Sequence, residues 1–116
     1  MVGLSAKPDR DSHQVAAYLK EHGYRVVPVN PTVDEVLGEK SYGSLHDIPF
    51  PVDIVDVFRR AEDAPAVVEE ALSLNPKAVW LQLGVVSDQA AAVARAAGVP
   101  LVMDRCLKRE HVRLGL

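Results

Sequence analysis

Cysteine is nearly absent from this sequence, with Cys106 as its one representative. A lone thiol cannot form an intramolecular disulfide, and it cannot supply a cysteine-rich zinc site. The four histidines do not fall at metal-ligand spacing either, so no metal site is expected. Because disulfides are rare in reducing compartments, this poverty in cysteine favours a cytoplasmic protein.

Long apolar runs and an excess of positive charge are also missing. No stretch approaches the roughly 18 apolar residues that a membrane span needs. The N-terminus lacks the basic start and apolar run of a signal peptide. The net charge is −3, which argues against nucleic acid as a partner because phosphate backbones need a concentrated basic face.

The sequence does contain enough apolar material for one folded domain. Its 116 residues are 48% hydrophobic, which fits a single domain over residues 1–116. Strand-like and helix-like segments alternate along it. Strands are expected at residues 1–4, 25–29, 52–57, 78–83 and 101–103. Helices are expected at residues 12–22, 65–72 and 88–97, with Ser12 and Ser87 as caps, and in a short polar segment after residue 103.

This alternation predicts an α/β fold of the Rossmann-like, doubly wound kind, with a mainly parallel five-stranded sheet and helices on both faces. Strands two to five are apolar on both faces, as parallel strands covered by helices are. Residues 32–51 are less regular, and a short helix at residues 33–37 and a turn at residues 44–47 are expected there. Only four residues precede the first loop, so the first strand is either short or begins before the recorded start.

The loop after the first strand has the composition of a phosphate site. Ligands of open α/β sheets bind at the carboxyl ends of strands, where the strand order reverses. Gly3 allows backbone to approach a ligand closely, while Ser5 and Ser12 offer hydroxyls. Lys7 and Arg10 add cationic donors, and the helix that begins near Ser12 points its free N–H groups into the same space. The loop therefore predicts a phosphate cradle, with an ordinary turn and helix cap as the alternative interpretation.

Two later strand exits carry polar residues as well. Phe58, Arg59 and Arg60 follow the third strand, where guanidinium groups could reach phosphate and the ring could lie against an apolar arm or a base. The alternative is a solvated arginine pair balanced by neighbouring acidic residues. Gln82 and Gly84 follow the fourth strand, and Gln82 is a polar residue on an otherwise apolar strand.

Nicotinamide dinucleotides fit these exits poorly. Their fingerprint is Gly-x-Gly-x-x-Gly, with an acidic residue roughly 20 positions further on. The first loop has Gly3-x-Ser5 without the later glycines, and the second strand ends in Asn30-Pro31 without Asp or Glu. Both halves of the fingerprint fail, so NAD is disfavoured.

Cys106 follows the fifth strand and has two interpretations. It can be a small buried hydrophobe, which is common for a lone cysteine. It also lies next to Arg105 and Lys108, whose charges favour a thiolate that could form a mixed disulfide with a thiol ligand.

Motifs in five segments, residues 2–12, 23–31, 55–60, 80–84 and 103–106, occur in order at these strand exits. Together they resemble the small bacterial CoA-binding proteins, stand-alone relatives of the CoA-binding domain in the α subunit of succinyl-CoA synthetase. The resemblance covers nearly the whole chain. It implies a Rossmann-like fold with coenzyme A lying across the strand ends, and the short first strand is its one departure.

By that resemblance, the first loop and Ser12 would hold the phosphates, and Asn30 and Pro31 would border the nucleotide. Phe58 and Arg59 would meet the pantetheine arm or the phosphates, and Cys106 would stand near the thiol. The candidate cofactor-binding residues are Gly3, Ser5, Ala6, Lys7, Arg10, Ser12, Asn30, Pro31, Phe58, Arg59, Arg60, Gln82, Leu83, Gly84 and Cys106.

The expected function is binding of coenzyme A or an acyl-CoA by a non-catalytic carrier, sensor or accessory module. The synthetase itself uses a phosphorylated histidine from a separate domain and a partner subunit, which 116 residues do not supply, so no catalytic residue is named. Alternatives are a thiol-dependent or nucleotide-dependent enzyme that uses Cys106, an NAD(P)-type binder, and a module that docks onto a larger protein.

Overall fold

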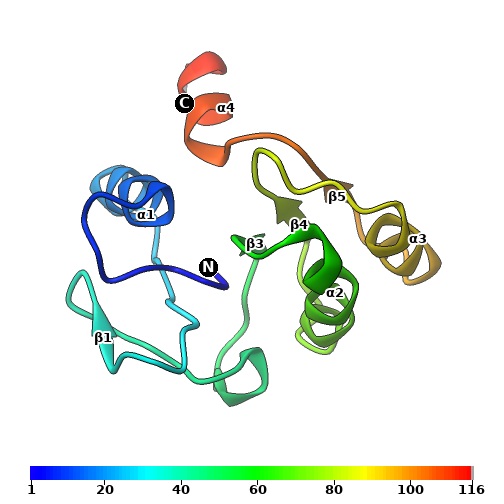
Figure 1. Ribbon diagram of the computed structural model, residues 1–116, viewed down its shortest axis with the longest axis horizontal. Coiled ribbons are helices and arrows are strands. Elements are labelled where there is room, and N and C mark those ends of the chain that lie inside the picture. The colour runs from blue at the N-terminus through cyan, green and yellow to red at the C-terminus, as the bar shows by residue number, and fades with distance from the viewer. Residues whose placement is uncertain (116) are drawn as a thin grey trace.

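A three-stranded parallel sheet lies at the centre of the computed structural model, which describes residues 1–115 (Figure 1). Its strands β3 (Ile54–Val57), β4 (Ala78–Leu81) and β5 (Leu101–Val102) are neighbours in that order. Val55 pairs with Val79, and Val79 with Leu101. The first two of these valines are almost fully buried, because helices cover both faces of the sheet, as the apolar strand pattern predicted.

The other two expected strands are reduced to single bridges, so the prediction of a five-stranded sheet is wrong in strand number. Val2 bridges Val29 on one side and Val57 on the other. Val29 N donates to Met1 O, and Gly3 N donates to Val29 O. Pro28 faces the other neighbour, where its carbonyl oxygen accepts from Tyr42 N and it has no N–H of its own to donate. The α/β class, the parallel pairing and the alternation with helices are confirmed.

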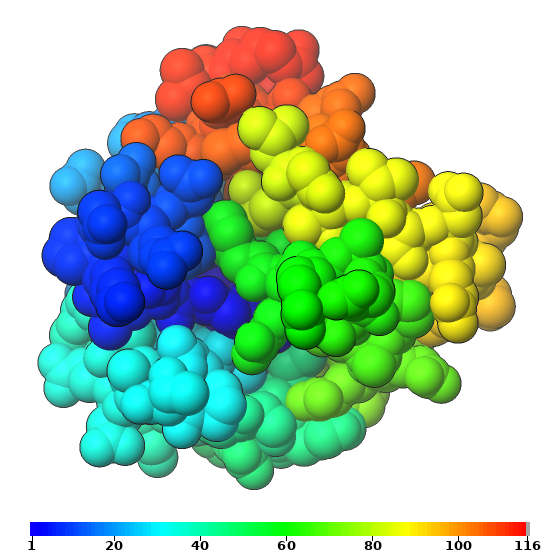
Figure 2. All heavy atoms as spheres, viewed as in Figure 1, coloured from blue at the N-terminus to red at the C-terminus, as the bar shows by residue number. Residues whose placement is uncertain are grey.

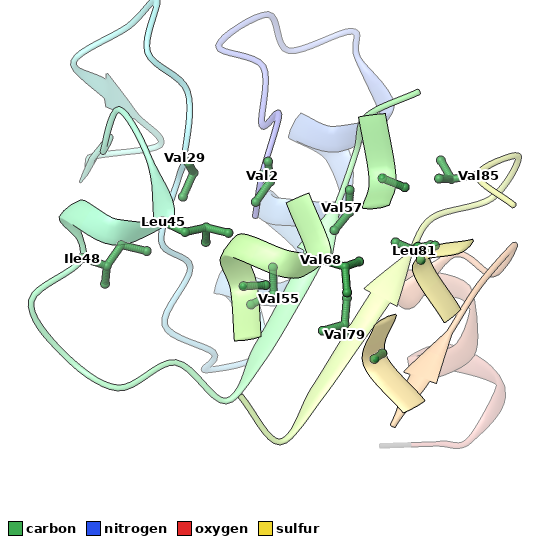
Figure 3. Packing of buried hydrophobic residues seen from close by; sticks show 14 residues of the cluster. Val2, Val29, Leu45, Ile48, Val55, Val57, Val68, Val79, Leu81 and Val85 are labelled. Carbon is green, nitrogen blue, oxygen red and sulfur yellow. The ribbon is translucent and has the colours of Figure 1, made fainter. Parts of the chain in front are cut away.

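The order of these segments places the strand reversal beside Val2. Figure 3 shows Val29, Val2, Val57 and Leu81 in a row across the core. The first segment of the chain therefore lies between the second and the third. In doubly wound folds such a reversal opens a crevice at the carboxyl ends of the strands.

Four helices cover the two faces of the sheet. α2 (Ala64–Leu72) and α3 (Asp88–Ala96) lie side by side on one face, and α1 (Asp11–Glu21) packs with α4 (Leu107–Arg113) on the other (Figure 1). Pro65 occupies the first turn of α2, and the Ser87 hydroxyl accepts a hydrogen bond from Ala90 N at 3.1 Å. Both start signals were predicted. No helix within residues 1–115 has the length and apolar character to cross a membrane.

Two local predictions are wrong. Residues 33–37 form no helix but part of a hairpin, in which β1 (Glu35–Val36) pairs antiparallel with β2 (Glu39–Lys40). Its two turn residues have φ of 53° and 78°, the pattern of a two-residue type I′ turn. Ser12 does not cap α1, because the helix begins at Asp11 and Ser12 is buried inside its first turn.

Two short 3₁₀ helices complete the fold. η1 (Leu45–Asp47) lies within the turn predicted at residues 44–47, and η2 (Ala61–Asp63) leads into α2. η2 thus connects the exit of β3 to a helix on the opposite face from α1.

Candidate functional site

A cleft of about 690 Å³ opens at the carboxyl ends of β3 and β4. Its walls come from the first turns of α1, the exits of both strands and the start of α4. The surfaces of these segments, coloured blue, green, yellow and orange, meet on one face in Figure 2. The lining residues are Asp11, Gln14, Val15, Phe58, Arg59, Arg60, Ala61, Asp63, Gln82, Leu83, Gly84, Val85, Cys106, Lys108 and Arg109.

A second hollow of about 420 Å³ adjoins the cleft at the start of α1. It shares Phe58 and Asp11 with the larger cleft. The remaining lining residues are Gly3, Ser5, Lys7, Arg10 and Ser12. The predicted phosphate loop, the β3 exit and the β4 exit therefore border one continuous crevice, at the position where the strand order reverses.

Ser12 organises the loop in front of α1. Its buried hydroxyl oxygen accepts a hydrogen bond from Ser5 N at 3.0 Å, and the Ser5 hydroxyl oxygen accepts one from Lys7 N at 3.1 Å. These bonds curl the loop so that its side chains surround the smaller hollow. Ala6, a predicted site residue, is exposed and lines neither hollow.

Replacing Ser12 with alanine is expected to lower the free energy of unfolding by about 1–2 kcal/mol, because the partly buried N–H of Ser5 loses its acceptor. Urea denaturation of wild type and variant measures this loss. Ser44→Ala is a suitable control, since within residues 1–115 the Ser44 hydroxyl bonds only to the exposed Asp47. Equal stability of the Ser12 variant and wild type would contradict the role given to this hydroxyl.

Gly3 brings the first loop against the exit of β3. Its φ is +84°, and an added Cβ would come well inside 3.0 Å of the carbonyl oxygen of Phe58. The same Cβ would lie 3.5 Å from Nε of Arg59. The absence of a side chain at Gly3 thus lets two strand exits approach each other. The predicted close approach to a ligand stays a prediction.

The two arginines after β3 differ in their partners. Arg60 forms ion pairs with Glu62 at 3.2 Å and with Asp63 at 3.4 Å. No carboxylate of residues 1–115 lies within ion-pair distance of Arg59, whose exposed side chain lines the cleft. Arg59 is therefore available to a ligand, whereas Arg60 matches the alternative interpretation of a solvated, balanced charge.

A buried pair of polar side chains includes one residue that lines the cleft, Gln82, and one beneath it that does not, Asp56. Gln82 Nε2 donates to Asp56 Oδ1 at 2.7 Å, and the two residues are 4% and 2% exposed. Burial raises the pKa of Asp56 to about 6, against the opposing effects of the Gln82 hydrogen bond and of the Met1 amino group. Burial likewise lowers the pKa of the Met1 amino group to about 6.

Asn30 and Pro31 lie outside both hollows. The Asn30 side chain donates to Leu4 O at 2.9 Å and accepts from Thr32 N at 3.0 Å. It thereby joins the end of the second segment to the end of the first. Pro31 is exposed. Neither Asn30 nor Pro31 is among the residues that line the two hollows.

α4 closes the cleft on the side opposite the loop of residues 5–10. Cys106, partly buried, lines the cleft with Lys108 and Arg109. The helix is held to α1 through His111, whose ring nitrogens lie 2.7 Å from the Tyr18 hydroxyl and 3.1 Å from the Tyr24 hydroxyl. This contact fixes the side of the cleft that carries the thiol.

Several lining residues were not predicted as site residues. Asp11 and Gln14 face the cleft from the first turn of α1, and Lys108 and Arg109 face it from α4. The start of a helix directly after the predicted phosphate loop was the available signal for Asp11 and Gln14, since side chains of a first helical turn border the loop before it. Within residues 1–115, no three His, Cys, Asp or Glu side chains gather as a metal site requires.

Comparison with known proteins gives a consistent result. The sequence pattern of a family described as CoA binding domain matches residues 1–112. Uncharacterized protein YneT of Bacillus subtilis (strain 168) is 45% identical over 111 residues, which are 96% of this chain and 82% of that protein. The solved structure of a hypothetical protein from Pyrococcus horikoshii OT3 has a TM-score of 0.95 and 44% identity, and the match covers 99% of this chain and 81% of that one.

A more distant relative is much longer. The ADP-forming acetate–CoA ligase II of Archaeoglobus fulgidus is 32% identical over 72 residues, which are 60% of this chain and 11% of that enzyme. The similarity is thus confined to a small part of the ligase.

Proposed function

Because the chain belongs to the CoA binding domain family, we propose that it binds coenzyme A in the crevice at the carboxyl ends of its parallel strands, without catalysing a reaction. The two adjoining hollows suit a molecule with two chemically different halves. Each hollow by itself lies within the range of about 300–1,000 Å³ that is typical of ligand pockets. The binding protein would act as a carrier, a sensor or an accessory module.

The smaller hollow is the proposed site of the phosphates. Lys7 and Arg10 border it beside the N-terminus of α1, whose free N–H groups and dipole favour negative charge. Arg59 lines the larger cleft next to Phe58, which borders both hollows, and it has no competing carboxylate partner among residues 1–115. This unpaired guanidinium next to a helix start is the observation that carries the proposal.

The larger cleft is the proposed site of the pantetheine arm. Phe58 separates it from the smaller hollow and offers an apolar surface. Gln82, Leu83 and Gly84 form the β4 side, and Cys106 lies on the α4 side. An arm that runs from the phosphates past Phe58 would bring its thiol toward α4.

Coenzyme A is expected to raise the melting temperature by several degrees, because a ligand at 100 times its Kd stabilises the native state by about 2.7 kcal/mol. Thermal denaturation with coenzyme A, acetyl-CoA and NAD measures the effect, and NAD is expected to give none. Cys106→Ala is expected to retain the shift, which separates simple binding from thiol chemistry. Unchanged melting with both CoA compounds at saturating concentration would refute the proposal.

A further inference from the structure

We propose that Asp56 is a positioning residue that holds the Gln82 side-chain amide with its oxygen toward the cleft, where it accepts a hydrogen bond from an N–H group of the ligand. The inference rests on the proposed function, since the pantetheine arm of coenzyme A carries two amide N–H groups. It assigns a role in ligand recognition to the buried carboxyl group of Asp56, which lines neither hollow.

The geometry gives the amide an inner and an outer end. Gln82 follows β4 and lines the cleft, although it is only 4% exposed. Asp56 lies on the neighbouring strand β3, opposite Trp80, and points to the same face of the sheet. In the hydrogen bond of 2.7 Å between Gln82 Nε2 and Asp56 Oδ1, the amide nitrogen points inward to the carboxyl group. The oxygen end is therefore the one presented to a ligand.

An ionised Asp56 permits only this orientation. A carboxylate accepts hydrogen bonds and donates none. If the amide turned over, its oxygen would face the carboxylate oxygen at hydrogen-bond distance in a buried place, and the two would repel each other. The negative charge below the cleft thus selects an acceptor rather than a donor at its floor.

Protonation of Asp56 removes this selection. The Oδ2 atom is buried and has no hydrogen-bond partner among residues 1–115, so a proton placed there would be an unsatisfied donor. A proton on Oδ1 is satisfied if the amide turns and accepts it with the Gln82 oxygen. The amide nitrogen then faces the cleft and meets the ligand N–H as a second donor.

The change falls within an accessible pH range. Burial raises the pKa of Asp56 to about 6. The charged group that acts on it is the Met1 amino group, whose own pKa burial lowers to about 6, and Gln82 is its uncharged neighbour on the β4 side. Asp56 is ionised above this value, so the acceptor is present at neutral pH and is lost as the pH falls through about 6.

The test compares the Kd of coenzyme A for wild type and for Asp56→Asn by titration calorimetry at about pH 5 and about pH 8. An asparagine can hold the Gln82 amide in either orientation and does not titrate, so the amide orientation in this variant does not change with pH. We expect Asp56→Asn to weaken binding roughly three- to tenfold at the higher pH, the value of one hydrogen bond, and to have almost no effect at the lower pH. The 3′-phosphate of the ligand titrates near pH 6. This changes the Kd of wild type and variants alike, so it cancels in the ratio of the variant Kd to the wild-type Kd.

Two further variants complete the comparison. Gln82→Ala is expected to give the same pH-dependent ratio as Asp56→Asn, because both remove the oriented acceptor. Asp53→Asn is the matched control: Asp53 is exposed, pairs with Lys77 and precedes β3 at its opposite end. The ratio of its Kd to the wild-type Kd is expected to stay near one at both pH values.

The outcomes separate this inference from the proposed function. If wild type binds coenzyme A but the Asp56→Asn ratio is the same at both pH values or near one at the higher pH, the positioning role is wrong and the binding function stands. If wild type binds no coenzyme A at either pH, both fall. An NMR titration of the Gln82 side-chain amide without ligand gives a second readout; its signals are expected to shift near pH 6 in wild type and not in Asp56→Asn.

Discussion

Replacing Gly3 with alanine is expected to lower the free energy of unfolding by about 2–4 kcal/mol and to abolish binding of coenzyme A. A side chain at φ +84° is strained in itself. The new Cβ would also meet the carbonyl group of Phe58, whose carbon lies 3.2 Å from that position. Relief of the clash requires the first loop and the β3 exit to separate, which takes Arg59 away from the first loop and its cationic side chains. Urea denaturation and calorimetric titration measure the two losses.

Gly23→Ala isolates the conformational part of this effect. Gly23 has φ +89° after the end of α1, and an added Cβ there meets nothing within 4 Å. The expected loss is about 1 kcal/mol with unchanged affinity for coenzyme A. Equal losses for the two glycine variants would show that the close approach of the two exits contributes nothing.

Arg59→Gln is expected to weaken coenzyme A binding roughly 10- to 100-fold, because a hydrogen bond to a charged group contributes about 1.5–3 kcal/mol. The stability of the free protein is expected to change little, since this exposed side chain has no carboxylate partner within residues 1–115. Raising the salt concentration is expected to narrow the difference between wild type and variant. Titration calorimetry with coenzyme A at two ionic strengths measures both effects.

Arg60→Gln is the matched control for this variant. The two arginines are adjacent and both line the cleft, but Arg60 is already paired with Glu62 and Asp63. Its loss is expected to weaken binding less than threefold. If both variants weaken binding equally, general positive charge rather than the placement of Arg59 accounts for the affinity.

The parallel sheet could be predicted because its strands carry a strong local signal. Val55, Val57 and Val79 are β-branched and lie in short apolar runs, and helix start signals separate these runs. The number of strands could not be predicted in the same way. A strand requires consecutive partners on a neighbouring segment, and the register that leaves Val2 with one bridge on each side is a property of the whole fold.

The hairpin at residues 35–40 was mistaken for a helix because its apolar spacing fits one. Val33, Val36 and Leu37 follow the i, i+3, i+4 pattern, and Gly38 follows them as a helix-ending glycine would. The structure forms a hairpin instead because Leu37 adopts a positive φ, which an α-helix does not allow. A leucine rarely adopts this conformation, so no propensity argument favours it.

The location of the candidate site followed from the strand exits, but the relations within it did not. A glycine, two arginines and a glutamine after successive parallel strands indicate a shared edge without further information. The pairing of Gln82 with Asp56 depends on strand register, and the ion pairs that occupy Arg60 depend on the η2 turn. A charged residue between Val55 and Val57 was the available signal for the buried carboxyl group.

The position of Val2 has a mechanical consequence for the domain. Backbone hydrogen bonds from Val2 N to Asp56 O and from Phe58 N to Val2 O join the N-terminal segment to β3, and few other backbone bonds cross this boundary. The crevice opens directly above this boundary, with Lys7 on the side of the N-terminal segment and Arg59 on the side of β3. A bound anion that contacts both sides would resist their separation. Amide hydrogen exchange at this boundary should therefore slow more on ligand binding than exchange between β4 and β5.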